Sequence, residues 1–384
     1  TTVSSDRLST NVKNTNFTAA EKQDLTNDIL PLATQFGQSK NLITNGAMIC
    51  SQRGSSFATV SNNETTIDQF ALTHPYGSSQ MSISQSTTAP DGFSNSYKLD
   101  VNTADTSIGA GQYVAIRHRI EAQNLQQLAF GTSGAKSIAL SFYVRSNVTG
   151  TYAVNIQQTD NSKKQVSATY TINSADTWER KTFTFAGDTS GVINNDTGTG
   201  FEILWYLAAG SNRNSGTARS TFTAHNLADE AAGHTANILS STSNNFHLTG
   251  CQLELGSVIT DFEHLSFGEN LKKCQRYYFQ LVDGDTQFVG IGHSFSSSEI
   301  DVGITFQTAM RTAPTLNQTT GGNYFGVLGG GDSSVYVDGN WTIFAPTEYG
   351  CFIYATPDGT ITAGNTKLVR STNASARLSF TAEL

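Results

Sequence analysis

From residue 41 to about residue 264, apolar and polar residues alternate with a period of two, in segments of strand length. Clusters of Gly, Asn, Asp and Ser separate the segments, so each strand buries one face and leaves the other face polar. We expect an antiparallel β-sandwich here, and a length of roughly 220 residues favours a jelly roll over a simple immunoglobulin sandwich. The clearest segments are 81–83, 97–101, 114–120, 138–144, 152–156, 166–172 and 201–207.

Residues 1–40 form a different, polar segment. The sequence TAAE at 18–21 matches a capping box and precedes three apolar residues at helical spacing, which predicts a short helix over about 19–30. A helix of this length is marginal in water unless its apolar stripe docks on another surface. We interpret residues 1–40 as an attachment arm; the alternative is a helix that lies on its own domain.

After residue 265 the periodicity changes twice. In 266–280, Leu271, Cys274 and Tyr278 fall on one helical face, which predicts a short linking helix. Alternation then resumes, and Asp338-Gly339 fits a hairpin turn between two strands. The predicted fold is therefore mainly β, with an N-terminal helical arm (1–40), an antiparallel jelly-roll sandwich (41–265), a linking helix (266–280) and a smaller C-terminal β-sandwich (281–384).

Composition and charge narrow the classes of function. Aromatic residues make up 10% of the chain, so we expect it to fold, and the net charge of −8 disfavours a surface that follows nucleic-acid phosphates. We expect no membrane insertion, because no apolar run reaches about 18 residues, and no signal peptide is visible. The four cysteines are widely separated, so we interpret them as free, mostly buried thiols made in a reducing cytoplasm.

The sequence offers little support for catalysis. It contains no HExxH, GxSxG, P-loop or GxGxxG motif in a suitable context, and we expect His118 to be a hydrogen-bonded core histidine. A polysaccharide depolymerase would need two carboxylates in one cleft, such as Glu202 with Glu254. We expect no enzyme activity, no cofactor and no metal; a structural calcium ion near Asp68 or at 283–285 is left open without a supporting motif.

The polar face of the main sandwich is the candidate binding surface. Strand alternation turns aromatic, amide and charged side chains away from the core, and such groups on one sheet face suit a glycan, which stacks on rings and exchanges hydrogen bonds with amides and carboxylates. An ordinary solvated sheet or a subunit contact is the alternative interpretation. The residues are Tyr143, Arg145, Asn155, Gln157, Glu202 and Tyr206.

Several short motifs together resemble a group of virion structural and tail fibre proteins of tailed bacteriophages, especially marine ones. The resemblance implies a jelly roll similar to carbohydrate-binding modules, a C-terminal β domain that contains MRTAP at 310–314, and no catalytic motif. The motifs are NLITNGAM at 41–48, QRG at 52–54, QLELG at 252–256, FE at 262–263 and CQRYY at 274–278.

The CQRYY motif falls on the predicted linking helix. We expect Tyr277 and Tyr278 to wedge between the two β domains, while Arg276 satisfies carbonyl groups or an acidic partner. An exposed tyrosine pair that binds a receptor is the alternative.

These observations predict a non-enzymatic bacteriophage virion protein of fibre or appendage type, which adheres to host surface glycan. The arm would bind other virion proteins, and the resemblance implies a homotrimer, located in the virion. The first alternative is a structural capsid decoration or fibre component without sugar binding. The second is the depolymerase.

Overall fold

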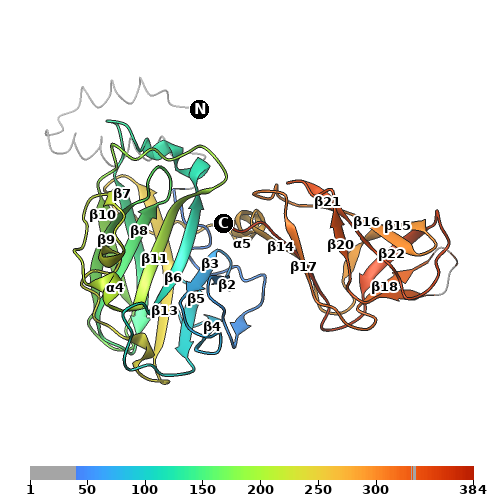
Figure 1. The fold of residues 1–384 in the computed structure, drawn as a ribbon, viewed down its shortest axis with the longest axis horizontal. Coiled ribbons are helices and arrows are strands. Elements are labelled where there is room, and N and C mark those ends of the chain that lie inside the picture. The colour runs from blue at the N-terminus through green and yellow to red at the C-terminus, as the bar shows by residue number, and fades with distance from the viewer. Residues whose placement is uncertain (1–39, 330, 332–333) are drawn as a thin grey trace. The chain divides into compact units, whose positions relative to one another are not determined.

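The computed structural model describes residues 40–329, 331 and 334–384 (Figure 1). The predicted attachment arm with its helix over 19–30 lies outside the described residues. Residues Leu42–Leu384 form one compact unit, which is described here by itself. Within the described part of the chain, no helix has the length and apolarity that a membrane span requires.

Two antiparallel sheets of the predicted sandwich face each other (Figure 1). The first has six strands in the order β1-β4-β5-β13-β7-β10: β1 (Ser56–Phe57), β4 (Met81–Ser86), β5 (Ser96–Val101), β13 (Asn245–Leu255), β7 (Ile138–Ser146) and β10 (Glu179–Phe185). The second has seven strands in the order β12-β9-β8-β11-β6-β3-β2: β12 (Thr223–Ala224), β9 (Lys164–Ile172), β8 (Gly150–Gln158), β11 (Thr199–Ala209), β6 (Tyr113–Glu121), β3 (Phe70–Thr73) and β2 (Glu64–Thr65). The chain crosses repeatedly between the sheets, and the predicted mainly β fold class is confirmed.

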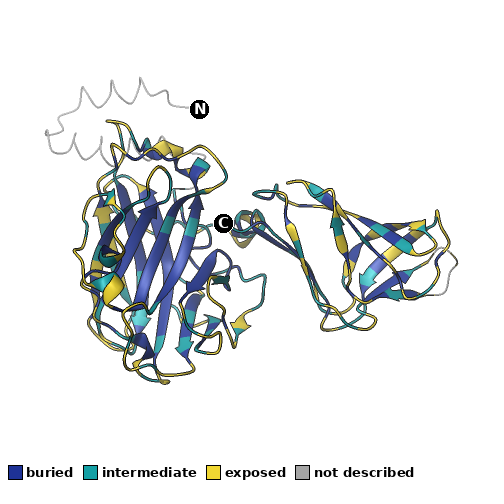
Figure 2. Cartoon of the chain, viewed as in Figure 1, coloured by how far each residue is buried: buried dark blue, intermediate teal, exposed yellow. Residues whose placement is uncertain are grey.

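The core of this sandwich forms where alternate side chains of both sheets meet. The rings of Phe142 on β7 and Trp205 on β11 lie edge to face with centroids 5.8 Å apart, and both side chains are fully buried. Figure 2 shows the buried residues in dark blue along β6, β8 and β11. The prediction for His118 is confirmed, because its ring is buried and its Nδ1 lies 3.0 Å from the carbonyl oxygen of Gln69.

Short helices occupy the connections. The linking helix α5 (Phe267–Gln275) begins with a capping box in which Ser266 and Glu269 each bond the other's backbone. The prediction that Tyr278 lies on this helix is wrong, because the helix ends at Gln275 and Tyr278 opens a strand. The spacing of apolar residues predicts a helix but does not show at which residue the helix ends. The other helices among the described residues are η2 (Ala122–Leu128), α4 (Ser211–Asn214), η3 (Leu227–Asp229) and η4 (Ile238–Ser240).

The C-terminal region is a second, smaller pair of antiparallel sheets with its own hydrophobic cluster. A three-stranded sheet has the order β14-β23-β17: β14 (Tyr278–Asp283), β23 (Arg377–Thr381) and β17 (Thr315–Gln318). A seven-stranded sheet has the order β19-β18-β22-β15-β16-β21-β20: β19 (Val335–Val337), β18 (Phe325–Leu328), β22 (Thr366–Ser371), β15 (Phe288–Ser296), β16 (Glu299–Thr305), β21 (Gly350–Ala355) and β20 (Thr342–Phe344).

The predicted hairpin at Asp338-Gly339 is wrong. The strands before and after it, β19 and β20, lie at opposite edges of the seven-stranded sheet and pair with β18 and β21. Gly339 does adopt a positive φ of 83°, as a turn requires, but a turn residue determines only the local bend and not which strand pairs with which.

Candidate functional site

The six predicted glycan-binding residues do not share one face. Four lie on the neighbouring strands β8 and β11 of the sandwich's seven-stranded sheet, and two lie on β7 of its six-stranded sheet. Alternation shows which side of its own sheet a residue faces, but it carries no information about which sheet the strand joins. The first group is Asn155, Gln157, Glu202 and Tyr206; the second is Tyr143 and Arg145.

The two residues of β7 are engaged locally. Arg145 forms an ion pair with Asp176 at 2.8 Å, and Tyr143 packs against Phe93 with ring centroids 5.4 Å apart. They therefore belong to a different surface from the other four residues.

Part of the outer face of the sandwich's seven-stranded sheet, over β9, β8 and β11, is covered by chain. The covering residues, 211–231, are called the cover segment here; they contain α4, β12 and η3. Two outward side chains of β9 anchor the segment, since Gln165 donates to the carbonyl of Asn226 at 2.7 Å and Ser167 to that of Asp229 at 3.0 Å. Asn155, Gln157 and Tyr206, which alternation predicts on a polar outer face, are each at most 1% exposed as a result.

Glu230 organises the polar contacts at the end of the cover segment. Its carboxylate accepts hydrogen bonds from Gln157 Nε2 at 3.0 Å and from the Tyr206 hydroxyl at 2.6 Å. His225 Nε2 lies 2.7 Å away, and Arg213 forms an ion pair with the same group. Burial opposes the negative charge, but these partners hold the pKa of Glu230 below its ordinary value. Glu230 is thus an anion that holds the cover segment on the sheet.

A hollow of about 290 Å³ opens beside this cluster. Its lining combines hydrogen-bond donors, acceptors and the rings of two tyrosines, which is the mixture that a polar ligand needs. The lining residues are Asn63, Thr73, Tyr113, Arg117, Gln157, Lys163, Glu202, Leu204, Tyr206, Arg213, His225, Leu227 and Glu230. We call this hollow the sandwich pocket.

Glu202 lies in the sandwich pocket between two arginines. Its Oε1 is 3.5 Å from Arg117 Nε and 3.5 Å from Arg119 Nη2, distances that leave room for further hydrogen bonds. Burial and the neighbouring Arg119 lower the pKa of Arg117, whose Nη1 donates to Asn63 Oδ1 at 2.5 Å. Lys163 forms no side-chain hydrogen bond or ion pair with any described residue, so its ammonium group is available to a ligand.

Sequence reasoning found three residues of this pocket, Gln157, Glu202 and Tyr206, and missed the rest. Arg117 and Tyr113 lie on β6, which is the neighbour of β11 in the sheet, with Arg117 opposite Leu204 in the register. Arg213 and His225 come from the cover segment, whose position depends on tertiary contacts. Alternation on β6 marks Arg117 as outward, but nothing in the sequence indicates that β6 and β11 pair.

The carboxylate pair suggested for a depolymerase does not form. Glu202 lies on β11, whereas Glu254 lies on β13 of the other sheet. Glu254 accepts hydrogen bonds from the backbone NH of Thr260 at 2.9 Å and from its hydroxyl at 2.7 Å. It therefore fixes the loop after β13.

The two places left open for calcium are occupied by protein contacts. Asp68 accepts hydrogen bonds from the backbone NH and the side chain of Gln52, and Asp283 forms an ion pair with Arg377. Across residues 40–329, 331 and 334–384, no three His, Cys, Asp or Glu side chains gather as a metal site.

A second polar cluster joins the sandwich to the three-stranded C-terminal sheet. Arg276 donates to both carboxylate oxygens of Glu121, at 2.5 and 2.8 Å, and to the carbonyl of Ala309 at 3.3 Å. Glu121 is completely buried at the end of β6, and this hydrogen bond raises the pKa of Arg276. Tyr277 is buried beside the same pair. We call these contacts, together with the polar contacts around Asp68, the domain junction.

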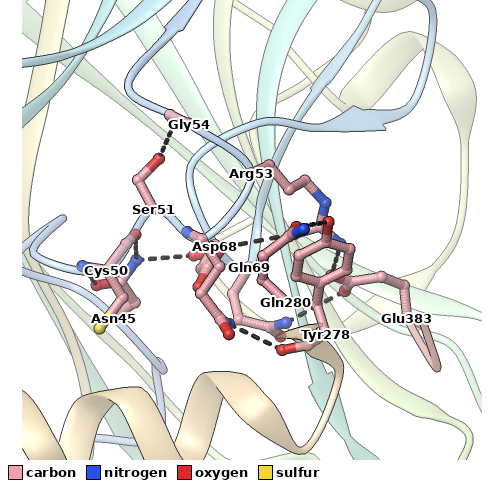
Figure 3. A network of polar contacts seen from close by, with 11 residues as sticks. Asn45, Cys50, Ser51, Arg53, Gly54, Asp68, Gln69, Tyr278, Gln280 and Glu383 are labelled. Carbon is pink, nitrogen blue, oxygen red and sulfur yellow. Dashed lines mark hydrogen bonds and ion pairs between the residues drawn. The ribbon is translucent and has the colours of Figure 1, made fainter. Parts of the chain in front are cut away.

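Figure 3 shows the rest of the domain junction around Asp68. Gln52 Nε2 donates to Asp68 at 2.8 Å and to the carbonyl of Tyr278 at 2.8 Å, so one amide bridges both β domains. Arg53 pairs with Glu383 at 2.7 Å and lies 3.6 Å above the ring of Tyr278. Burial raises the pKa of Asp68 to about 6, although Arg53 and Gln52 oppose the shift.

Three of the motifs noted in the sequence, QRG, CQRYY and MRTAP, meet at this junction. QRG at 52–54 and CQRYY at 274–278 supply the contacts just described. Arg311 of MRTAP donates to the carbonyl of Thr197 in the sandwich at 2.9 Å, and to those of Ala382 at 2.7 Å and Glu383 at 2.6 Å in its own domain. These motif residues therefore hold the two β domains together and lie outside the sandwich pocket.

Comparisons with known proteins give similarity at the level of fold. No protein family model and no curated protein matches the chain. Among solved structures, 56% of the chain is similar to the enzymatically active domain of bacteriophage CBA120 tailspike protein 4, at 13% identity and a TM-score of 0.30, over 21% of that chain. A putative sugar binding protein from Bacteroides thetaiotaomicron (11% identity, TM-score 0.31) and TmCBM61 in complex with β-1,4-galactotriose (7%, 0.28) each match 56% of this chain and 99% of their own. At these identities and TM-scores the similarities are weak and carry no functional argument.

Proposed function

We propose that this chain is a non-enzymatic adhesion protein of a bacteriophage particle, and that its sandwich pocket binds a host surface glycan. The observation that carries the proposal is the placement of Glu202 between Arg117 and Arg119 in an open, polar hollow. Sugar hydroxyl groups both donate and accept hydrogen bonds, so a carboxylate flanked by guanidinium groups can engage neighbouring hydroxyls of one ring.

The unused hydrogen-bonding capacity of the pocket supports binding. The ammonium group of Lys163, which lines the pocket, has no side-chain partner among the described residues. An oxygen of a ligand could therefore accept a charge-assisted hydrogen bond from it. Tyr113 adds an aromatic ring to the same wall.

The state of the pocket carboxylates supports adhesion over hydrolysis. A glycosidase needs a protonated carboxylic acid opposite a second carboxylate. Glu230 has a lowered pKa and four partners, so it is poorly suited to donate a proton. Glu254 is fixed in a loop on the other sheet.

The test is to titrate the full chain with host surface polysaccharide and to assay the mixture for new reducing ends. We expect saturable binding that is at least tenfold weaker in Glu202→Gln. Binding should be unchanged in Asp176→Asn, which removes an exposed carboxylate in the turn between β9 and β10. Unchanged binding in Glu202→Gln would contradict the pocket assignment, and the absence of any binding would favour the purely structural component. New reducing ends that disappear in Glu202→Gln would favour the depolymerase.

The proposed location in the virion rests on the resemblance of residues 41–278 to phage virion proteins, which also underlies the proposed homotrimer. Imaging of particles labelled on this chain tests the location, and sedimentation equilibrium tests the trimer. The expected contact of the arm with other virion proteins involves residues outside the described part of the chain.

A further inference from the structure

The seven-stranded sheet of the C-terminal domain presents an unusually aromatic outer face. Phe295, Phe344 and Phe352 are 68%, 62% and 54% exposed. Large apolar side chains exposed together mark interaction sites on most soluble proteins. Figure 2 shows the exposed residues of this sheet in yellow.

Strand register brings these rings together around a groove of about 440 Å³. Phe352 on β21 lies opposite Phe344 on β20 and opposite Gly303 on β16. A side chain at Gly303 would begin 3.6 Å from the Phe352 ring, so glycine keeps the space beside that ring open. Phe295 reaches the groove from β15.

Two carboxylates line the same groove from its central strand, β16. The side-chain carboxylates of Glu299 and Asp301 form no hydrogen bond or ion pair with any described residue. Asp301 Oδ1 is buried without a donor, and burial raises the pKa of this group. Of the described residues, no lysine or arginine lines the groove.

We propose that this groove is a second carbohydrate site, specific for a neutral saccharide. A pyranose ring offers an apolar C–H face to the aromatic rings and hydroxyl donors to the two carboxylates, which can only accept while they are ionised. A second copy of the chain that docked by an apolar face would bury both carboxylates without donors, at a cost in free energy. An acidic sugar would meet Glu299 and Asp301 in a lining without lysine or arginine, where the basic group next to Asp301 is the imidazole of His293.

This proposal goes beyond the proposed function, because it concerns a different domain and a different set of residues. The sandwich pocket contains Arg117, Lys163 and Arg213 among its lining residues, whereas the groove contains aromatic rings and carboxylates alone. The two sites would therefore select different saccharide units.

The experiment is calorimetric titration of the full chain with neutral gluco-, manno-, galacto- and N-acetylglucosamine oligosaccharides, and with an oligogalacturonate as the acidic comparison. We expect at least one neutral oligosaccharide to bind, and the oligogalacturonate not to bind at the groove. Phe352→Ala should weaken neutral binding at least tenfold, and Glu299→Gln should weaken it severalfold; both positions are surface positions, and circular dichroism checks the fold. The matched control is Phe288→Ala, which removes a ring 58% exposed on β15 that does not line the groove, and it should bind as the wild type does.

The proposal would be overturned if no neutral oligosaccharide bound, or if Phe352→Ala and Phe288→Ala bound equally well. It would also be overturned if the protein were an oligomer that dissociated in Phe352→Ala, because the aromatic face would then be an interface between copies of the chain. Failure of the sandwich pocket leaves a different pattern, in which Glu202→Gln keeps its binding to host polysaccharide. Glu202→Gln should also keep neutral binding at the groove.

Discussion

The ion pair between Glu121 and Arg276 should be the strongest single polar contact of the domain junction. Its distances are 2.5 and 2.8 Å, and Glu121 is 0% exposed. In Arg276→Met the aliphatic part of the side chain is kept, but the carboxylate stays buried with only neutral donors, Gln123 Nε2 at 2.6 Å and the Tyr277 hydroxyl. Removing one partner of a buried pair costs about 3 to 5 kcal/mol.

The reverse substitution should cost less. In Glu121→Gln, Arg276 keeps the carbonyl of Ala309 and is 25% exposed, so water can solvate its charge. We expect a loss of about 1.5 to 3 kcal/mol, the value of a hydrogen bond to a charged group. The double variant, Glu121→Gln with Arg276→Met, contains no buried carboxylate without its partner. Its loss of unfolding free energy should therefore be smaller than the sum of the two single losses by about 1.5 kcal/mol or more.

Differential scanning calorimetry of the wild type, the two single variants and the double variant measures this coupling energy. Each kcal/mol should lower the midpoint of the transition that includes the junction by about 2 to 4 °C. A coupling energy below about 0.5 kcal/mol, with the single losses simply additive, would show that the pair does not hold the two β domains together.

Three further predictions concern pH and packing. Burial lowers the pKa of His118 to about 3, so the unfolded state takes up the proton first and stability should fall as the pH drops below about 6.5. The thermal unfolding midpoint should therefore fall less steeply between pH 7 and 4.5 in His118→Gln than in the wild type, and an unchanged slope would refute this. The pKa of Asp68 is raised to about 6, so the folded state protonates this carboxylate before the unfolded state does, and stability should gain from it as the pH falls from about 6 to 4. Thermal midpoints of Asp68→Asn over the same pH range should lack this gain in stability. Phe142→Ala removes a fully buried ring that packs on Trp205 and should cost about 3 to 5 kcal/mol in urea unfolding, whereas a loss under 1 kcal/mol would mean that the two sheets do not depend on this contact.

Local pattern was sufficient for much of the fold. Alternation identified seven strands between Met81 and Leu207, because a half-buried strand needs apolar residues at every second position, whatever it pairs with. It did not mark β10 (Glu179–Phe185). The linking helix was placed correctly up to Gln275 for the same reason, with a period of 3.6. Its end was misjudged because Tyr278 suits a helix face and a buried strand equally well.

Pairing, by contrast, was decided by tertiary structure. Tyr143 and Glu202 show the same alternation, yet they belong to opposite sheets, and the strands on either side of Asp338-Gly339 lie at opposite edges of one sheet. The sandwich pocket and the aromatic groove depend on that pairing. Arg117 meets Glu202 because β6 pairs with β11, and Phe344 meets Phe352 because β20 pairs with β21.

The chain by itself therefore determined which residues form strands and which side of each strand is apolar, since both depend on neighbours within a few positions. Only the tertiary structure decided that residues 211–231 cover the seven-stranded sheet, and that the two binding surfaces combine side chains distant in sequence. These contacts join residues far apart along the chain, and their free energy comes from burial and hydrogen bonds that exist only once the sheets have assembled.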